Sequence, residues 1–167
     1  MAWLRAIVFS SLFAGVFLLW LPFTIAAGDR GSLWNAGPAL RVVGWSGIVV
    51  GGAIVIWCIA TFVFVGLGTP APFDPPRRLV TRGPYEYVRN PMYLGGSLVL
   101  LGELILFGSR ALVLYELVWA IVLYAFVVAY EEPKLRRTFG DEYERYCANA
   151  GRWLPRIRNS VTRERNA

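Results

Sequence analysis

The sequence predicts an all-α protein of the membrane, with about four transmembrane helices and an amphipathic helix near the C-terminus. Of the 167 residues, 56% are hydrophobic and the mean hydropathy is +0.49, which is too apolar for an ordinary soluble domain. Two long stretches, 6–27 and 42–68, contain no charged residue. Two more, 91–109 and 111–130, contain one glutamate each. About 20 apolar residues are enough for a helix to span a bilayer.

These runs predict one membrane-embedded domain, residues 1–157, followed by a disordered basic tail at 158–167. The loop 69–90 begins with a proline-rich segment that cannot be helical throughout. Apolar residues recur about one turn apart in the segment 133–149, which predicts an interfacial helix that Gly140 could interrupt. The expected transmembrane helices are 3–27, 42–68, 91–108 and 111–130. The glycines of the segment 44–52 suit close helix packing in lipid.

The first apolar run has a second interpretation, a cleaved signal peptide, because Arg5 precedes it and small residues lie near its end. The run is longer than a usual signal core, and three more apolar helices follow it. A retained membrane helix is therefore the expectation.

Basic residues lie mostly in two places. Four arginines fall in the loop between the second and third helices, and nine basic residues follow Glu132. Because positive charge is retained on the cytoplasmic side, both termini and the loop 69–90 are expected to face the cytoplasm. The polar strip 82–96 would then lie on the same side as the C-terminal tail.

The net charge of +6 is explained by this bias and by attraction to anionic membrane lipids, so no nucleic-acid partner is expected. There is no histidine, and the two cysteines lie far apart, one in an apolar run and one in the tail. These features predict no disulfide and no Cys- or His-based metal site. They also exclude an imidazole base and a Ser-His triad.

The strip RGPYEYVRNPMYLGG, residues 82–96, differs sharply from its apolar surroundings. Asn90 is expected to be the N-cap of the third helix and Pro91 its first residue. Tyrosines are enriched at membrane interfaces as anchors, and Tyr124 and Trp119 are assigned to anchoring or packing. The density of tyrosines beside Asn-Pro indicates a further role for Tyr85, Tyr87 and Tyr93.

The adjacent carboxylates Glu131 and Glu132 are expected at the C-terminal end of the fourth helix, where the helix dipole is already negative. They could be exposed at the surface with Lys134, Arg136 and Arg137 as partners. Alternatively they could join the tyrosines of the strip in binding an organic cation, since aromatic faces attract positive charge. Two other acids, Glu103 and Glu116, lie within apolar helices, where acids are often functional. Helix packing or a place near the far interface is expected for both.

Two stretches, LVTRGPYEYVRNPMYLG and EEPKLRRTFGDEYERYCANAGRWLP, together resemble the membrane methyltransferases related to isoprenylcysteine carboxyl methyltransferase. Phospholipid N-methyltransferases share this arrangement. The resemblance covers residues 77–155, and it implies S-adenosylmethionine as the cofactor. Methyl transfer from a sulfonium needs little acid–base help and depends mainly on orientation.

The resemblance also implies site residues. Tyr85 and Tyr93 would wall the sulfonium or the adenine, Glu131 would contact polar groups of the donor, and Asn90 would bond its methionine part. The implied cofactor-binding residues are Leu79, Val80, Gly83, Tyr85, Asn90, Pro91, Met92, Tyr93, Glu131 and Glu132. The implied catalytic residues are Arg89, Asn90 and Tyr93, and Arg152 is the implied substrate-binding residue, followed by Pro155.

The chain departs from the family pattern at two positions. Asn90 replaces the usual histidine, and an amide can still donate and accept hydrogen bonds but cannot serve as a base. Val127 stands about where prenylcysteine enzymes carry an arginine for the substrate carboxylate.

The leading hypothesis is S-adenosylmethionine-dependent methyl transfer, by direct in-line attack, to a lipophilic acceptor from the bilayer: a carboxylate, a phenol or a lipid amine. One alternative is an NADPH-dependent membrane reductase related to sterol reductases, with Arg77, Arg78 and Arg82 holding the extra phosphate. Another is a non-catalytic four-helix membrane subunit. No oligomeric state is predicted.

Overall fold

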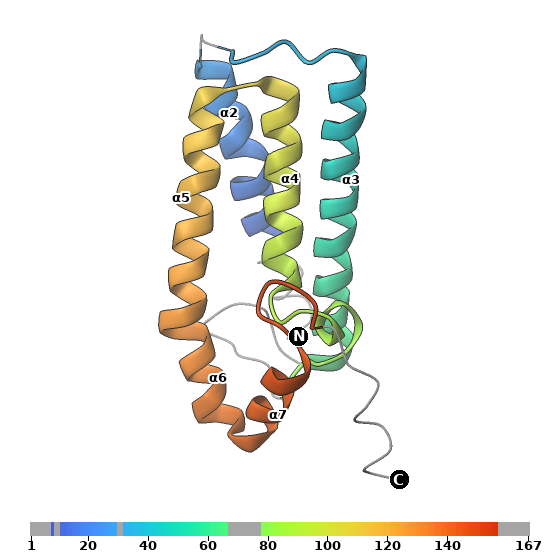
Figure 1. Ribbon diagram of the computed structural model, residues 1–167, viewed down its shortest axis with the longest axis vertical. Coiled ribbons are helices and arrows are strands. Elements are labelled where there is room, and N and C mark those ends of the chain that lie inside the picture. Colours follow the sequence, from blue (N-terminus) through green and yellow to red (C-terminus); the bar gives the residue numbers. More distant parts are fainter. Residues whose placement is uncertain (1–7, 9–10, 30–31, 67–77, 157–167) are drawn as a thin grey trace.

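The computed structural model describes residue 8 and residues 11–29, 32–66 and 78–156, and within them it is helical, with isolated bridges but no β-strand (Figure 1). The all-α prediction is confirmed. The helices and helical turns are η1 (Gly15–Trp20), α2 (Leu21–Gly28), α3 (Pro38–Thr61), η2 (Phe62–Gly66), η3 (Gly83–Glu86), α4 (Pro91–Phe107), α5 (Arg110–Phe126), η4 (Val127–Glu131), α6 (Glu132–Phe139) and α7 (Asp141–Asn149). Of these, η1, η2 and η4 are π-helical and η3 is a 3₁₀ turn.

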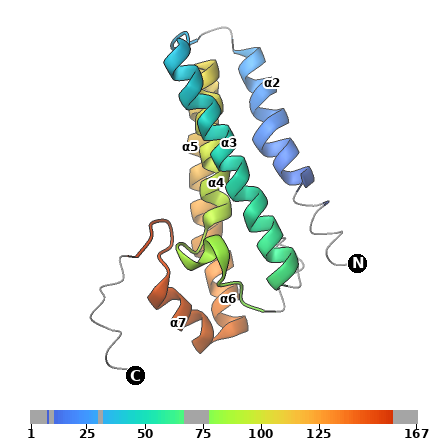
Figure 2. The same cartoon turned by 90° about the vertical axis from the view of Figure 1, so that its right-hand side faces the viewer.

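Among the described residues, three helical segments are long and apolar enough to cross a membrane: Ser11–Gly28, Pro38–Phe64 and Arg110–Phe139. The third helix along the chain, α4, is apolar but shorter than these, as its sequence between Pro91 and Gly108 predicts. In both views α3, α4 and α5 run side by side along the long axis (Figures 1 and 2). The chain is therefore a membrane protein built as a bundle of apolar helices.

Several helix ends differ from the predicted bounds. The second helix begins at Pro38, four residues before the expected start, because extended Gly37 precedes a proline at the first turn. The third ends at Phe107, where Gly108 takes a left-handed conformation (φ 61°) that closes the helix. The described part of the first helix runs from Ser11 to Gly28. Its expected start, much of the loop 69–90 and the expected disordered tail lie outside the described residues.

The largest error concerns the fourth helix, whose predicted end at residue 130 is wrong. The helix continues through η4 and α6 to Phe139. Pro133 lies in the first turn of α6, directly after the π-helical turn, in which the Glu132 N–H bonds to the Val127 carbonyl. The wider π turn gives the proline ring room that an ordinary α-helix lacks. The chain turns at Gly140 (φ 50°), so the segment 133–149 forms two helices, α6 and α7, and the interruption that the sequence predicts at Gly140 is confirmed.

Glycines bring the backbones of α3 and α4 into direct contact. A Cβ atom at Gly51 would lie 2.5 Å from the Gly95 carbonyl oxygen, and one at Gly102 would lie 2.5 Å from the Gly44 carbonyl oxygen. The glycine-rich segment 44–52 therefore packs helices, as its sequence predicts.

This contact predicts different outcomes for two adjacent glycines. Gly51→Ala should lower the stability of the protein by about 1–3 kcal/mol, because the new methyl group collides with backbone. Gly52→Ala should be neutral or slightly stabilising, since a Cβ at Gly52 meets nothing within 4 Å. Unfolding of the purified variants in detergent measures both. Equal stabilities would contradict the close backbone contact.

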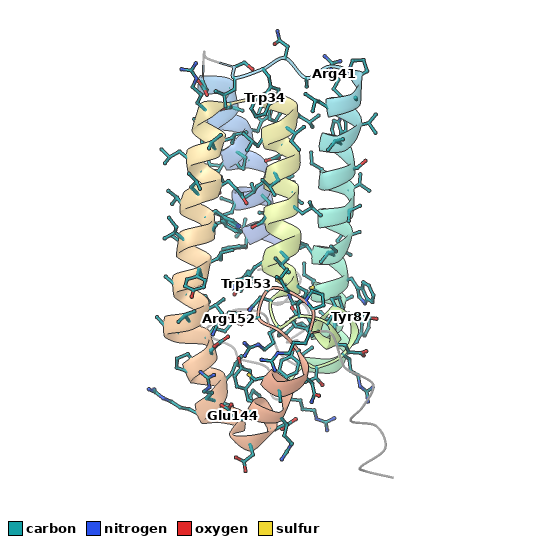
Figure 3. All side chains as sticks on the ribbon, in the orientation of Figure 1. Trp34, Arg41, Tyr87, Glu144, Arg152 and Trp153 are labelled. Carbon is teal, nitrogen blue, oxygen red and sulfur yellow. The ribbon has the colours of Figure 1, made fainter. Side chains whose placement is uncertain are left out.

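The two ends of the bundle are built differently. At one end, the Trp34 indole donates to the Ile105 carbonyl (3.0 Å) and the Ser109 hydroxyl donates to Asp29 (2.7 Å), so the connection before α3 is fastened to the α4–α5 turn. At the other end lie η3, α6 and α7 (Figure 1). Figure 3 shows Trp34 and Arg41 at the first end, with Tyr87 and Arg152 toward the second.

Candidate functional site

The strip 82–90 folds over the end of α3. Its turn needs Gly83, which has φ +62°, and a Cβ there would lie 3.1 Å from the Thr61 hydroxyl oxygen. The turn buries Tyr85 (7% exposed), whose ring packs edge-on against Phe62 at 5.4 Å. Burial raises the pKa of Tyr85 well above its ordinary value, and nearby Cys58 adds to the shift. The Tyr85 phenol therefore stays protonated.

Besides the side-chain contacts of Arg89 given below, three hydrogen bonds hold the strip against the C-terminal residues 146–156, which are called the tail from here on. The Arg89 N–H donates to the Gly151 carbonyl (2.8 Å), the Tyr146 hydroxyl to the Tyr85 carbonyl (2.8 Å), and the Asn90 amide nitrogen to the Arg152 carbonyl (3.1 Å). The predicted proximity of strip and tail is confirmed.

Asn90 does not cap the helix as expected. It occupies the N-cap position before Pro91, but its side chain makes no capping hydrogen bond. The amide is directed to the tail instead.

The two adjacent glutamates have different environments. Glu132 is 3% exposed and lies among three arginines: Arg152 makes two bonds to it (2.7 and 2.9 Å), Arg89 lies at 3.3 Å and Arg136 at 3.8 Å. Glu131 instead accepts a hydrogen bond from the Tyr93 hydroxyl (2.9 Å). Neighbouring helical residues point about 100° apart, so one carboxylate can face the tail while the other faces the bundle. Of the two alternatives, exposure at the surface is wrong for Glu132, although Arg136, one of the partners expected there, does lie beside this carboxylate.

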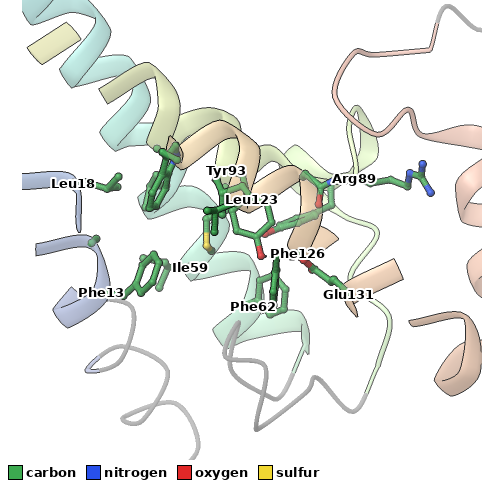
Figure 4. Close-up of a pocket in the computed structure, with 17 residues that line it drawn as sticks. Phe13, Leu18, Ile59, Phe62, Arg89, Tyr93, Leu123, Phe126 and Glu131 are labelled. Carbon is green, nitrogen blue, oxygen red and sulfur yellow. Dashed lines mark hydrogen bonds between the residues drawn. The ribbon is translucent and has the colours of Figure 1, made fainter. Parts of the chain in front are cut away.

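A cavity of about 330 Å³ lies beside Glu131 and Tyr93 (Figure 4). Figure 4 shows Phe62 and Phe126 near these two residues. Each π-helical turn contributes a wall residue, and such turns are frequent at functional sites. The walls are Phe13, Ala14, Leu18, Val55, Ile59, Phe62, Tyr85, Arg89, Asn90, Met92, Tyr93, Gly96, Trp119, Val122, Leu123, Phe126 and Glu131.

The structure brings six of the predicted site residues to this cavity and leaves six away from its walls. Those on the walls are Tyr85, Arg89, Asn90, Met92, Tyr93 and Glu131. Those away from them are Leu79, Val80, Gly83, Pro91, Glu132 and Arg152. Figure 4 shows the Arg89 guanidinium directed away from Glu131; it pairs with Glu132 and donates to the Cys147 sulfur.

Tyr87 does not join the other tyrosines of the strip, since it is 62% exposed and is not among the wall residues. Val80 (5% exposed) is buried in the same hydrophobic cluster as Tyr85 and packs there rather than on the cavity wall. Arg152 is committed to Glu132 by two hydrogen bonds, so its guanidinium fastens the tail.

Sequence reasoning missed the wall that the first helix provides. Phe13, Ala14 and Leu18 line the cavity together with Trp119, which the sequence assigned to anchoring or packing. Nothing local distinguishes these residues from lipid-facing ones, because every side of a membrane helix is apolar. Val127, which stands about where prenylcysteine enzymes carry an arginine, is fully buried and is not among the wall residues.

The remaining acids do not line the cavity. Glu103 and Glu116 each have one buried carboxylate oxygen without a hydrogen-bond partner. Among the described residues, no group of three or more His, Cys, Asp or Glu side chains could hold a metal ion. The distinctive chemistry of the cavity is therefore its polar end, where a carboxylate lies among tyrosine and phenylalanine rings, a combination that suits an organic cation.

The sequence model of the phospholipid methyltransferase family matches residues 40–142, which include Tyr85, Asn90, Tyr93 and Glu131. The chain belongs to this family. It is 37% identical over 82 residues to protein-S-isoprenylcysteine O-methyltransferase of Schizosaccharomyces pombe, a match that covers 47% of this chain and 34% of that protein. It is 38% identical over 63 residues to an uncharacterized protein of Haemophilus influenzae, covering 38% of this chain and all of that protein. The chain thus spans about a third of the length of the S. pombe protein.

Proposed function

We propose that this protein is an S-adenosylmethionine-dependent methyltransferase that acts on a lipophilic acceptor from the bilayer. The observation that carries the proposal is the Tyr93–Glu131 pair at the polar end of an otherwise apolar cavity. Both the pair and the strip around it lie within the part of the chain that the family model matches.

The polar end of the cavity fits the charge of the donor. S-adenosylmethionine supplies an activated methyl group on a positively charged sulfonium. Tyr85 and Tyr93 offer ring faces and Glu131 offers negative charge, and both attract an organic cation. The Asn90 amide nitrogen is used by the Arg152 carbonyl, so its oxygen is the atom available to accept a hydrogen bond from the donor.

The residues of the site orient the reactants rather than exchange protons with them. The Tyr93 hydroxyl donates to Glu131, which fixes the carboxylate beside the cavity. The acceptor attacks with a lone pair, and the sulfur keeps the electrons of the broken bond, so in-line alignment in a dry cavity is the main requirement. An acceptor that carries a proton at its nucleophile would release it to water.

The acceptor follows from what the cavity offers. The arginine that prenylcysteine enzymes carry for a substrate carboxylate is replaced here by Val127, which is buried. The Arg89 guanidinium is already paired with Glu132. A carboxylate acceptor would therefore meet Glu131 without a nearby unpaired cation. A hydroxyl, thiol or amine on an apolar body fits better. We propose that the site faces the cytoplasm, because the distribution of basic residues predicts that the loop and the tail lie on that side.

Binding of the donor to the purified protein tests the proposal. Saturable binding of S-adenosylmethionine and of its demethylated product is expected by isothermal titration, with no comparable binding of NADPH. Preferential binding of NADPH would favour the reductase hypothesis, although Arg78 and Arg82 are exposed and lie off the cavity wall. No saturable binding of any of the three would overturn an enzymatic function for this site.

A further inference from the structure

The inner half of the cavity depends on a helix outside the family match. The family model begins at residue 40, whereas Phe13, Ala14 and Leu18 of the first helix line the cavity. This helix is attached to α5. The Phe13 and Phe17 rings lie 6.1 and 6.5 Å from the Trp119 ring.

Gly96, Leu18 and Trp119 meet at the inner end of the cavity. A Cβ atom at Gly96 would lie 3.4 Å from a methyl carbon of Leu18 and 3.5 Å from the Trp119 ring. Leu18 is itself 7% exposed and belongs to a buried cluster with Val55. On the continuous helix Arg110–Phe139, Trp119 is the wall residue farthest from Glu131. That separation corresponds to about 18 Å along the helix axis.

The chemistry of this inner half suits hydrocarbon. Its walls carry no ionisable or amide side chain among the described residues Phe13, Ala14, Leu18, Val55, Gly96 and Trp119. The one hydrogen-bond donor among these side chains is the Trp119 indole N–H, which is buried without a partner, so a nucleoside or an amino acid there would lose most of its hydrogen bonds to water without replacement. An alkyl chain loses none. A volume of about 330 Å³ for the whole cavity is at the small end of ligand cavities, so its inner half suits one slender chain rather than two acyl chains.

We propose that the inner half of the cavity holds the apolar chain of the methyl acceptor, and that the first helix limits the length of that chain. This inference rests on the proposed function and adds the acceptor class: an amphiphile with one slender hydrocarbon chain. Its nucleophile lies beside the hydrogen-bonded pair of Tyr93 and Glu131, and its chain extends toward Gly96. Leu18 and Gly96 face each other at the end of the chain and determine which lengths are accepted.

Photolabelling of the purified full-length protein tests this placement. The probe is a 16-carbon primary alcohol with a diazirine at the carbon farthest from the hydroxyl, and labelled residues are located by mass spectrometry. Labelling is expected on the segment Ser11–Gly28 and around Trp119. A second probe, with the diazirine next to the hydroxyl, should label near Tyr93 and Glu131.

Glycine substitutions provide matched variants. Gly96→Leu fills the inner end and should reduce labelling there about tenfold, the effect of displacing roughly two methylene groups. Gly96→Ala adds one methyl at ordinary contact distance and should reduce it about fourfold. Gly52→Leu, on a face where a Cβ meets nothing, should have no effect. Leu18→Ala should shift the preferred probe to one that is longer by a few carbons.

Labelling confined to lipid-facing residues such as Trp45 and Ile56, or equal yields in Gly96→Leu and Gly52→Leu, would overturn the inference. Binding of radiolabelled S-adenosylmethionine to the same samples separates the two proposals. Retained donor binding in Gly96→Leu, together with lost inner labelling, supports both. If the unaltered protein binds no donor, the proposed function fails and the acceptor assignment fails with it, whatever the labelling shows.

Discussion

Glu131→Gln should weaken binding of S-adenosylmethionine roughly 10- to 100-fold, because contacts to a charged group are worth about 1.5–3 kcal/mol. The amide keeps the size of the side chain and can still accept from the Tyr93 hydroxyl, so the loss reports the missing negative charge. Equilibrium binding of the radiolabelled donor to the purified variant measures it. Tyr93→Phe removes the hydroxyl but keeps the ring, and a smaller loss is expected.

Glu142→Gln is the matched control, since Glu142 is exposed on α7. It should bind the donor as the unaltered protein does. If Glu131→Gln and Glu142→Gln bind equally well, the carboxylate does not recognise the donor and the site must be assigned differently. Thermal unfolding of both variants should be unchanged, which separates a loss of recognition from a loss of fold.

Glu132→Gln should destabilise the C-terminal segment by about 3 kcal/mol, because removing one partner of a buried ion cluster leaves the other charges uncompensated. Arg89 and Arg152 would both lose the carboxylate that now lies at 3.3 and 2.7 Å. Hydrogen exchange in α7 should become roughly 100-fold faster. Asn90 and Tyr85 line the cavity and are hydrogen-bonded to this C-terminal segment. Loosening the segment should therefore also weaken donor binding.

A second acidic residue serves as the control for this prediction. Glu144 pairs with Arg136 at 2.9 Å, but these side chains are 57% and 47% exposed, and exposed pairs contribute about 0–1 kcal/mol. Glu144→Gln should therefore change exchange very little. In the double variant Glu132→Gln/Arg152→Gln, the loss should be smaller than the sum of the single losses. Equal exchange in Glu132→Gln and Glu144→Gln would show that the ion cluster does not hold the tail.

The helical class, the membrane location and the family could all be predicted from local sequence. Apolar runs of sufficient length can satisfy their backbone in lipid only as helices or as a closed barrel, and the run lengths at 42–68 and 111–130 favour helices. The Asn90–Pro91 pair marked the start of the third helix correctly. The polar strip and the acidic pair stood out because lipid tolerates few such residues, and both do lie at the cavity end of the bundle.

What the sequence could not determine is which side of each helix faces protein. Phe13, Leu18 and Trp119 line the cavity, but in a membrane helix apolar side chains face lipid and protein alike, so no periodicity separates them. The continuation of the fourth helix past Pro133 depends on the π-helical turn before it, which composition does not reveal. Glu131 and Glu132 have equal chemistry in the sequence. Only the tertiary structure assigns one to the cavity and the other to the tail, because their partners, Tyr93 for the first and Arg89 and Arg152 for the second, come from segments distant along the chain.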